Sequence, residues 1–251
     1  WSNYHGAYFA VIDSMTKIVA AGGNYADIRL TFQEYFEKLG KDPIKWGKPF
    51  SALLGAYYAQ MKLDIPGIGG KDSMSGTFKD LDVPPTLVAF AVAVTDAGQA
   101  LSTEFKKIGS NIVLLELDSD YNDLPDFDQL DKNFARVHEM AKSGKILSAQ
   151  SVRHGGIAAA ISNMCFGNKV GADLKGFDNE EEWFVPKYGS LLLEIDSNIN
   201  IEEAFCGLKY KIIGQTTDIK RISISKAKSR NRLIQGLMRG RFMTGLMKGR
   251  L

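Results

Sequence analysis

A short segment rich in glycine, charge and hydroxyl groups has the residue types that phosphate chemistry requires. Its sequence, IGGKDSMSGTF, spans residues 68–78 and includes the end of a short apolar run. Two adjacent glycines let the backbone turn sharply, so that amide groups can approach a phosphate closely. A lysine adds a mobile cation, an aspartate adds a metal ligand, and a serine adds a hydroxyl group. We therefore predict a phosphate-side loop formed by Gly69, Gly70, Lys71, Asp72 and Ser73.

The segment departs from the Walker A pattern of nucleotide-binding loops. That pattern needs a glycine five residues before the Gly-Lys pair, where this chain has Ile65. It also needs Ser or Thr directly after the lysine, where this chain has Asp72. Glycine-rich segments often serve turns without binding a ligand, so a structural glycine segment is the alternative to a phosphate loop.

Periodic apolar residues predict helices and strands on both sides of this segment. Helical spacing is found over residues 7–21, 46–62, 128–142 and 156–164, with a short helix near 201–205. Strand patterns are found over residues 27–32, 65–68, 86–94, 111–117, 146–149, 170–174, 190–195, 209–213 and 221–224. Mixed strands and helices with short links predict a layered α+β fold.

A polar stretch at residues 96–107 separates two regions of this pattern. We predict a first domain over residues 1–100 and a second over residues 108–225, the latter an α/β sandwich. Residues 226–251 hold eight Lys or Arg and no acid, and their glycines disfavour a helix. We expect this basic tail to be disordered, although such a tail is also found in anchors for anionic surfaces.

Composition excludes several classes of protein. No apolar run reaches the roughly 18 residues that a membrane helix needs, and the first residues lack the pattern of a signal peptide. The two cysteines are too few for a disulfide framework, so we expect a cytoplasmic protein. Without the tail, 23 basic residues stand against 29 acidic ones, a net charge of −6, which argues against a nucleic-acid-binding domain.

The remaining chemistry-bearing side chains have structural explanations. Cys165 lies on the apolar face of its predicted helix and is expected in the core. His138 is expected to face solvent on its helix, and His5 is expected in a loop. No Cys-His-Glu constellation for glutamine hydrolysis is found, so this chain is not expected to be a glutaminase.

A longer pattern extends from the glycine segment through most of the chain. GGKDSMSG at 69–76 is followed by DVPPTLVAFAVA at 82–93. Upstream lie HGAYFAVIDSMTKIVAAGG at 5–23 and IRLTFQEYFEKLGKDPIKWGKPFSALLGAYYAQ at 28–60; downstream lie SVRHGGIAAAISNMCFGNKVG at 151–171 and YGSLLLEID at 188–196. Together these segments resemble the second synthetase unit, of the PurM-like kind, of the large multidomain phosphoribosylformylglycinamidine synthases. The resemblance covers almost all of residues 1–225 and none of the tail.

The resemblance implies an ATP-dependent ligase of purine biosynthesis. Such an enzyme uses ATP to activate an amide oxygen of formylglycinamide ribonucleotide, and ammonia from glutamine then displaces phosphate to give the amidine. The implied cofactors are ATP or ADP with Mg²⁺. The implied partners are a first synthetase unit and a glutamine amidotransferase domain, or a second copy in a homodimer, with neither nucleic acid nor membrane. We expect the sequence to be a fragment, incomplete at both ends and within its first domain.

The resemblance also implies positions for metal ligands. In the family, an acidic residue and an amide on the first helix bind the metal, together with an aspartate in a His-Asp-x-Ser-Asp-Gly-Gly loop. Asp13 stands at the acidic position and is the family-type metal ligand that remains. Lys17 stands at the amide position and cannot ligate a cation. In the loop, Gln150, Ser151, Arg153 and His154 replace the polar family residues, while Gly155 and Gly156 are kept.

Two interpretations of these replacements stay open. Lys17 and Arg153 could neutralise phosphate in place of a metal ion, with Gly155 and Gly156 at the start of a helix. Alternatively, the nucleotide site is lost and the chain is a non-catalytic structural half that pairs with a catalytic unit.

Other functions have less support in the sequence. Aminoimidazole ribotide synthase and selenophosphate synthetase belong to the same superfamily, but Lys71-Asp72-Ser73 differs from their equivalent loops. An RNA-binding protein would depend on residues 226–251 and leave the body incidental.

Overall fold

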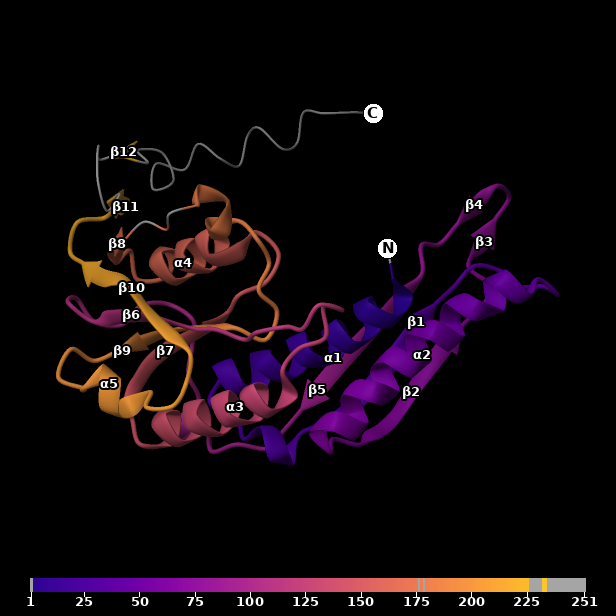
Figure 1. Cartoon of the computed structure of the whole chain (residues 1–251), viewed down its shortest axis with the longest axis horizontal. Coiled ribbons are helices and arrows are strands. Elements are labelled where there is room, and N and C mark those ends of the chain that lie inside the picture. The colour runs from indigo at the N-terminus through magenta and orange to yellow at the C-terminus, as the bar shows by residue number, and fades with distance from the viewer. Residues whose placement is uncertain (1, 176, 178, 226–231, 234–251) are drawn as a thin grey trace. The chain divides into compact units, whose positions relative to one another are not determined.

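The structure is a computed structural model that describes residues 2–175, 177, 179–225 and 232–233, and it divides into two compact units (Figure 1). The first unit contains residues up to Ala100 together with Leu117–His138. The second contains Leu101–Glu116 and the chain from Glu139 onward. The sequence pattern assigned residues 117–138 to the second region, whereas their contacts group them with the first unit.

The first unit contains a three-stranded sheet and three long helical segments. Its sheet has the order β2-β1-β5, with β1 parallel to β2 and antiparallel to β5. The elements are α1 (Asn3–Ala20), β1 (Arg29–Tyr35), α2 (Pro43–Leu63), β2 (Gly67–Ser73), β3 (Thr77–Phe78), β4 (Leu81–Asp82), β5 (Thr86–Val92) and most of α3 (Phe127–Lys142), with short 3₁₀ turns at Tyr25–Asp27 and Ala97–Gln99.

Local sequence explains where the first two helices begin and end. The Ser2 hydroxyl accepts a hydrogen bond from the His5 amide and caps α1. Asp42 caps α2, whose first residue is Pro43, a residue that suits this position because its missing N–H would have no helical partner. Asp64 ends α2 in the left-handed conformation. The predicted helices at 7–21 and 46–62 are confirmed, and each begins a few residues earlier than expected.

The sheet of the first unit has one buried face and one exposed face. Leu30 of β1 is fully buried, and the paired Ala91 of β5 lies on the same face. The alternate residues form the opposite face, which we call the outer sheet face. It carries Thr31, Gln33 and Tyr35 from β1 and Val88, Phe90 and Val92 from β5. Val92 is 53% exposed and Phe90 46%, so apolar side chains of this face meet solvent.

The second unit is built on a seven-stranded sheet with the order β12-β11-β8-β10-β6-β9-β7. Among the strand pairs that the structure describes in this sheet, only β8 with β11 is parallel. The predicted α+β fold is thereby confirmed. The elements are β6 (Asn111–Leu115), β7 (Ile146–Ser151), α4 (Gly156–Phe166), β8 (Gly171–Lys175), a 3₁₀ turn at Glu180–Trp183, β9 (Leu191–Ile195), α5 (Ile201–Ala204), β10 (Tyr210–Thr217), β11 (Ile222–Ser225) and β12 (Arg232–Leu233).

Apolar side chains of α4 form the core of the second unit against the sheet. Ile157, Ile161 and Met164 of α4 are buried with Ile112 and Leu192 from the strands. The core also contains Cys165, as the sequence predicted; its burial raises the pKa of the thiol to about 12. A thiol in this state is a packing residue rather than a nucleophile.

Glu194 is a fully buried carboxylate in β9 that fixes the chain entering the second unit. It accepts hydrogen bonds from the backbone amides of Lys106 (2.8 Å) and Lys107 (2.9 Å) and from the Ser148 hydroxyl (2.8 Å). These three donors satisfy the carboxylate structurally, so it is not a candidate for chemistry.

Two histidines correct the sequence-based expectations. His5 lies in α1 rather than in a loop, and its ring nitrogens contact the Ser2 hydroxyl and the Asn122 carbonyl. His138 is half-buried, and its Nδ1 contacts the Gly22 carbonyl at 3.1 Å. Both contacts bind residues 117–138 to the first unit.

The basic tail lies largely outside the described residues, and its predicted disorder stays a prediction. Arg232–Leu233 is described as β12, a strand that the tail's sequence did not predict. Among the helices described, none is both long enough and apolar enough to cross a lipid bilayer.

Candidate functional site

The predicted phosphate-side loop is a β-strand. Gly69 through Ser73 belong to β2, and each of these five residues pairs with a residue of β1. The prediction of a loop is therefore wrong for these five residues. Packing between the strands explains the glycine at position 70. A Cβ on Gly70 would lie 2.6 Å from the Phe32 carbonyl oxygen, so Gly70 lets β1 and β2 approach each other. A Cβ on Gly69 would meet no atom within 4 Å.

The strand places the charged side chains of this segment on different faces. Lys71 pairs in register with Gln33 and therefore lies on the outer sheet face. Asp72 pairs with Glu34 and lies on the opposite face. Lys71 donates a hydrogen bond to the Asp72 backbone carbonyl at 3.2 Å. Because successive strand residues point in opposite directions, the Lys71 ammonium and the Asp72 carboxylate do not form one binding group.

Glu34 is an acidic neighbour of Asp72 that the sequence analysis missed. Burial, and secondly the negative charge of Asp72, raise the pKa of the Glu34 carboxyl. The pairing depends on the register of two parallel strands, so no local sequence signal could have found it. Two carboxylates alone are a weak cation site, and the described residues contain no group of three or more His, Cys, Asp or Glu suited to a metal ion.

Asp13 and Lys17 form an ion pair on α1. The Lys17 ammonium lies 2.7 Å from Asp13 Oδ2, and the Asp13 side chain is only 17% exposed. Residues four apart on a helix are neighbours, and such pairs contribute about 0.3–0.5 kcal/mol. The pair is therefore weak enough to open. While it is closed, the Lys17 ammonium occupies the place beside Asp13 where a metal cation would bind.

The Gly155-Gly156 pair begins α4 in the second unit. Both residues have positive φ, 84° and 65°, and Gly155 caps the helix without a side-chain hydrogen bond. A Cβ on Gly156 would lie 2.5 Å from the Trp183 carbonyl oxygen, so this glycine also allows a close backbone approach. Arg153 and His154 are exposed immediately before the helix. A helix N-terminus favours an anion, which is compatible with the predicted phosphate contact.

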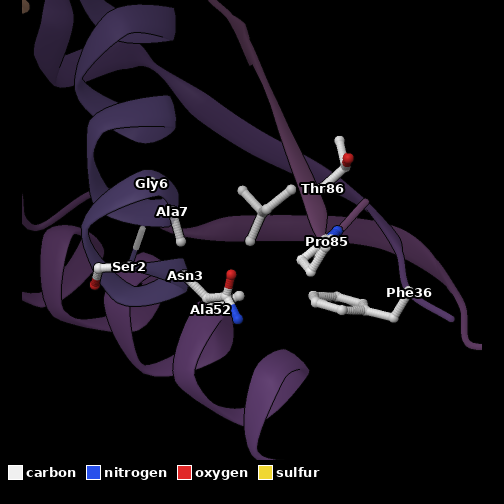
Figure 2. Close-up of a pocket in the computed structure, with 9 residues that line it drawn as sticks. Ser2, Asn3, Gly6, Ala7, Phe36, Ala52, Pro85 and Thr86 are labelled. Atoms are coloured by element: carbon white, nitrogen blue, oxygen red, sulfur yellow. The ribbon is translucent and has the colours of Figure 1, made fainter. Parts of the chain in front are cut away.

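A cavity of about 320 Å³ lies in the first unit beside the start of α1 (Figure 2). Figure 2 shows Phe36 and Pro85 on one side and Asn3 with Ala52 on the other. Its polar groups are already engaged: Asn3 donates to the Lys48 carbonyl, and Thr86 donates to the Pro84 carbonyl. None of the predicted site residues lines this cavity. The cavity therefore does not correspond to the predicted nucleotide site.

A buried acid holds the start of α2. Glu37 is 4% exposed and forms ion pairs with Lys48 and, at 2.7 Å, with Lys45. Hydrogen bonds from these lysines lower the pKa of the Glu37 carboxyl to about 2. This group stabilises the fold and is not available to a ligand.

Comparison with known proteins identifies the fold of the chain but does not assign the chain to a family. No protein-family model matches the chain. The curated phosphoribosylformylglycinamidine synthase subunit PurL of Sulfurovum sp. (strain NBC37-1) is 26% identical over 243 residues, which are 84% of this chain and 31% of the relative. The PurL subunit of Thermoplasma volcanium is 24% identical over 245 residues, again covering 31% of the relative. The chain thus spans about a third of the length of the curated relatives it matches.

Solved structures give a closer likeness in fold than in sequence. Thermotoga maritima PurL complexed with FGAR superposes with a TM-score of 0.74 at 12% identity, covering 94% of this chain and 43% of that one. A chain in the crystal structure of a HypE–HypF complex is also similar in fold. It superposes with a TM-score of 0.68 at 14% identity, covering 91% of this chain and 83% of that one. The chain has an α+β, PurM-like fold that is similar to the fold of the PurL and HypE structures.

Proposed function

We propose that this chain, with its PurM-like synthetase fold, is part of the ATP-dependent ligase that converts formylglycinamide ribonucleotide to formylglycinamidine ribonucleotide. The observation that carries the proposal is the run of family-like segments spanning both units, supported by PurL relatives that match 84–85% of the chain. HypE is similar in fold, but the GGKDSMSG and DVPPTLVAFAVA segments favour the purine enzyme.

The chain's own residues support phosphate binding better than metal binding. Asp13 is paired with Lys17, and no three-ligand group is found in the described part of the chain. The residues present therefore do not fit Mg²⁺, and we assign it no step. Arg153 and the first amides of α4 offer positive charge and N–H donors to a nucleotide phosphate. Their contribution would be to orient ATP and stabilise charge on its phosphates.

The Asp13–Lys17 pair favours a second candidate, a structural half-unit without catalysis. A lysine held 2.7 Å from the remaining acidic ligand position opposes cation binding there. Such a unit would complete a larger enzyme by pairing its sheet with that of a catalytic unit. The outer sheet face, with Phe90 and Val92 about half exposed, is the surface that suits this role.

Both candidates place the chain in a larger cytoplasmic complex. A first synthetase unit would cover the outer sheet face, and a glutamine amidotransferase domain would supply ammonia. We expect the 251 residues alone to form no product from formylglycinamide ribonucleotide, ATP and ammonia, because the proposed reaction needs another synthetase unit and because two family-type ligand positions are replaced here.

Calorimetric titration of the 251-residue chain with ATP or ADP, with and without Mg²⁺, separates the two candidates. Binding that weakens when Arg153 is replaced by alanine supports the nucleotide-binding unit; Lys220→Ala, at an exposed cation elsewhere on the second unit, is the control. No heat of binding with a folded chain supports the structural half. Product formation by the chain alone above a heat-inactivated control would contradict the structural half and the expected inactivity of the isolated chain.

A further inference from the structure

A stripe of large apolar side chains runs along α2 on the side opposite its buried residues. The buried side of α2 holds small residues, among them Ala52, Ala56 and Ala59. Successive residues of a helix are rotated by about 100°, and on this rotation the large apolar residues of the opposite side fall within an arc of about 100° around the helix axis. We call this set the α2 stripe: Trp46 (52% exposed), Phe50 (61%), Leu53 (56%), Leu54 (42%), Tyr57 (57%) and Met61 (63%).

No charged residue interrupts the α2 stripe. The charged residues of the helix stand near its two ends, where Lys45 pairs with Glu37 and the Lys62 ammonium lies over the Tyr58 ring at 5.7 Å. Monomeric proteins seldom leave a continuous apolar surface of this kind in water, and such surfaces mark association sites.

The spacing within the α2 stripe is the same when it is counted from either end. From Trp46 the steps are four, three, one, three and four residues to Met61. A twofold axis between Leu53 and Leu54 therefore maps the stripe onto itself. A helix with such a stripe is complementary to an antiparallel copy of itself, as a closed twofold interface requires.

We propose that the α2 stripe binds a second copy of this chain through an antiparallel α2–α2 pair. In this pair Trp46 faces Met61 of the other copy, a favourable contact between sulfur and an aromatic ring. Phe50 faces Tyr57, and Leu53 faces Leu54 across the axis. The antiparallel arrangement also sets the helix dipoles in opposite directions.

The area of the α2 stripe is sufficient for a dimer of modest strength. Fully buried aromatic side chains remove about 150–250 Å² each from water, so six half-exposed side chains offer on the order of 600 Å² per copy. Two copies then bury about 1,200 Å², the lower limit of stable interfaces. The charges near each end include both signs: Lys41, Lys45 and Lys48 with Glu37 and Asp42 at one end, and Lys62 with Asp64 at the other. No block of like charge therefore opposes pairing.

This inference is independent of the proposed function, since it uses α2 and not the outer sheet face or the predicted nucleotide site. Sedimentation velocity of the 251-residue chain is the first test. It covers about 1 to 200 µM, because an interface at the lower limit of stable size is expected to be weak. We expect a dimer that Leu53→Glu or Tyr57→Glu weakens at least about tenfold. Ile44→Glu is the matched control: Ile44 is 77% exposed on the same helix but outside the stripe.

Cysteine cross-linking tests the antiparallel geometry. The experiment uses a Cys206→Ser background, because Cys206 is exposed and Cys165 is buried. Leu53→Cys lies beside the axis and should form a disulfide-linked dimer on mild oxidation. Met61→Cys should not, because its counterpart lies about 22 Å away along the helix axis at 1.5 Å per residue.

Several outcomes would overturn the proposal. These are a folded chain that stays monomeric at every concentration, a dimer unaffected by Leu53→Glu and Tyr57→Glu, and equal cross-linking of Met61→Cys. A dimer lost only on substitution of Val92 would assign self-association to the outer sheet face instead. Circular dichroism of each variant confirms that it remains folded before its result is used.

Discussion

Gly70 of β2 lies so close to Phe32 of β1 that a β-carbon at position 70 would stand 2.6 Å from the Phe32 carbonyl oxygen. The neighbouring Gly69 has open space where its β-carbon would be. Two adjacent glycines thus have different structural needs, although the sequence suggested one shared role in a loop. This difference allows the structural and the phosphate-binding interpretations to be separated by experiment.

We expect Gly70→Ala to destabilise the first unit by about 1–3 kcal/mol, because the strands must move apart to admit the methyl group. Gly69→Ala should change stability by less than about 0.5 kcal/mol. Urea unfolding followed by circular dichroism measures both. If Gly69→Ala leaves stability unchanged but weakens ATP binding, the segment contacts phosphate despite its strand conformation. Equal destabilisation by the two variants would contradict the structure.

Lys17→Asn should remove the ammonium that pairs with Asp13 and restore an amide at the position where the family has one. Removing the ammonium 2.7 Å from Asp13 removes a positive charge that opposes a cation. We expect Mg²⁺ to strengthen ADP binding at least about tenfold more in this variant than in the original chain, a difference of about 1.4 kcal/mol. Calorimetric titration measures it, with Lys17→Arg as the control that keeps the ion pair. An unchanged Mg²⁺ effect would mean that Asp13 is not a metal ligand.

Charged substitutions on the outer sheet face should weaken pairing with another synthetase unit. Val88 and Val92 lie on the same face of β5, as the alternation of a strand predicted, and this face is the exposed one. Burying apolar area contributes about 25 cal/mol per Å², and a buried lysine adds a desolvation cost. Val88→Lys and Val92→Lys should therefore lower the association constant between this chain and the other synthetase unit, which light scattering measures. Ile219→Lys is the control, because Ile219 is an exposed apolar residue of the second unit.

Local elements could be predicted from the sequence because they depend on neighbouring residues. The period of apolar residues located α1 and α2, although the structure shows that Asp42 caps α2 and that the helix begins at Pro43, three residues before the predicted start. The Asp13–Lys17 pair also has a local cause, the i to i+4 spacing on a helix, and this spacing was the signal that could have revealed it.

Features that depend on distant contacts could not be predicted in this way. Lys71 and Asp72 were expected in one loop, but the register with β1 sends them to opposite faces. Glu34 meets Asp72 only through the same register. Residues 117–138 join the first unit through contacts more than 100 residues apart, such as His138 with Gly22. No single stretch of sequence contains these relationships.

Acid should destabilise the chain partly through Glu37. Its pKa in the folded chain is about 2, below the ordinary value of 4.5, because Lys45 and Lys48 donate hydrogen bonds to the carboxylate. The unfolded chain therefore binds the proton more readily than the folded one. The stabilisation from this group is present above pH 4.5 and is lost as the pH falls toward 2.

Glu37→Gln should consequently lower stability at pH 7 and reduce the further loss between pH 4.5 and pH 2, since the amide cannot take up the proton. Urea midpoints at several pH values measure both effects. Glu203→Gln is the control, because Glu203 is an exposed acid on α5 of the second unit. A Glu37→Gln variant with the same acid sensitivity as the original chain would show that the two lysines do not hold Glu37 as a carboxylate. Loss of stability at pH 7 alone would not be sufficient, because deleting any buried partner of α2 would produce it.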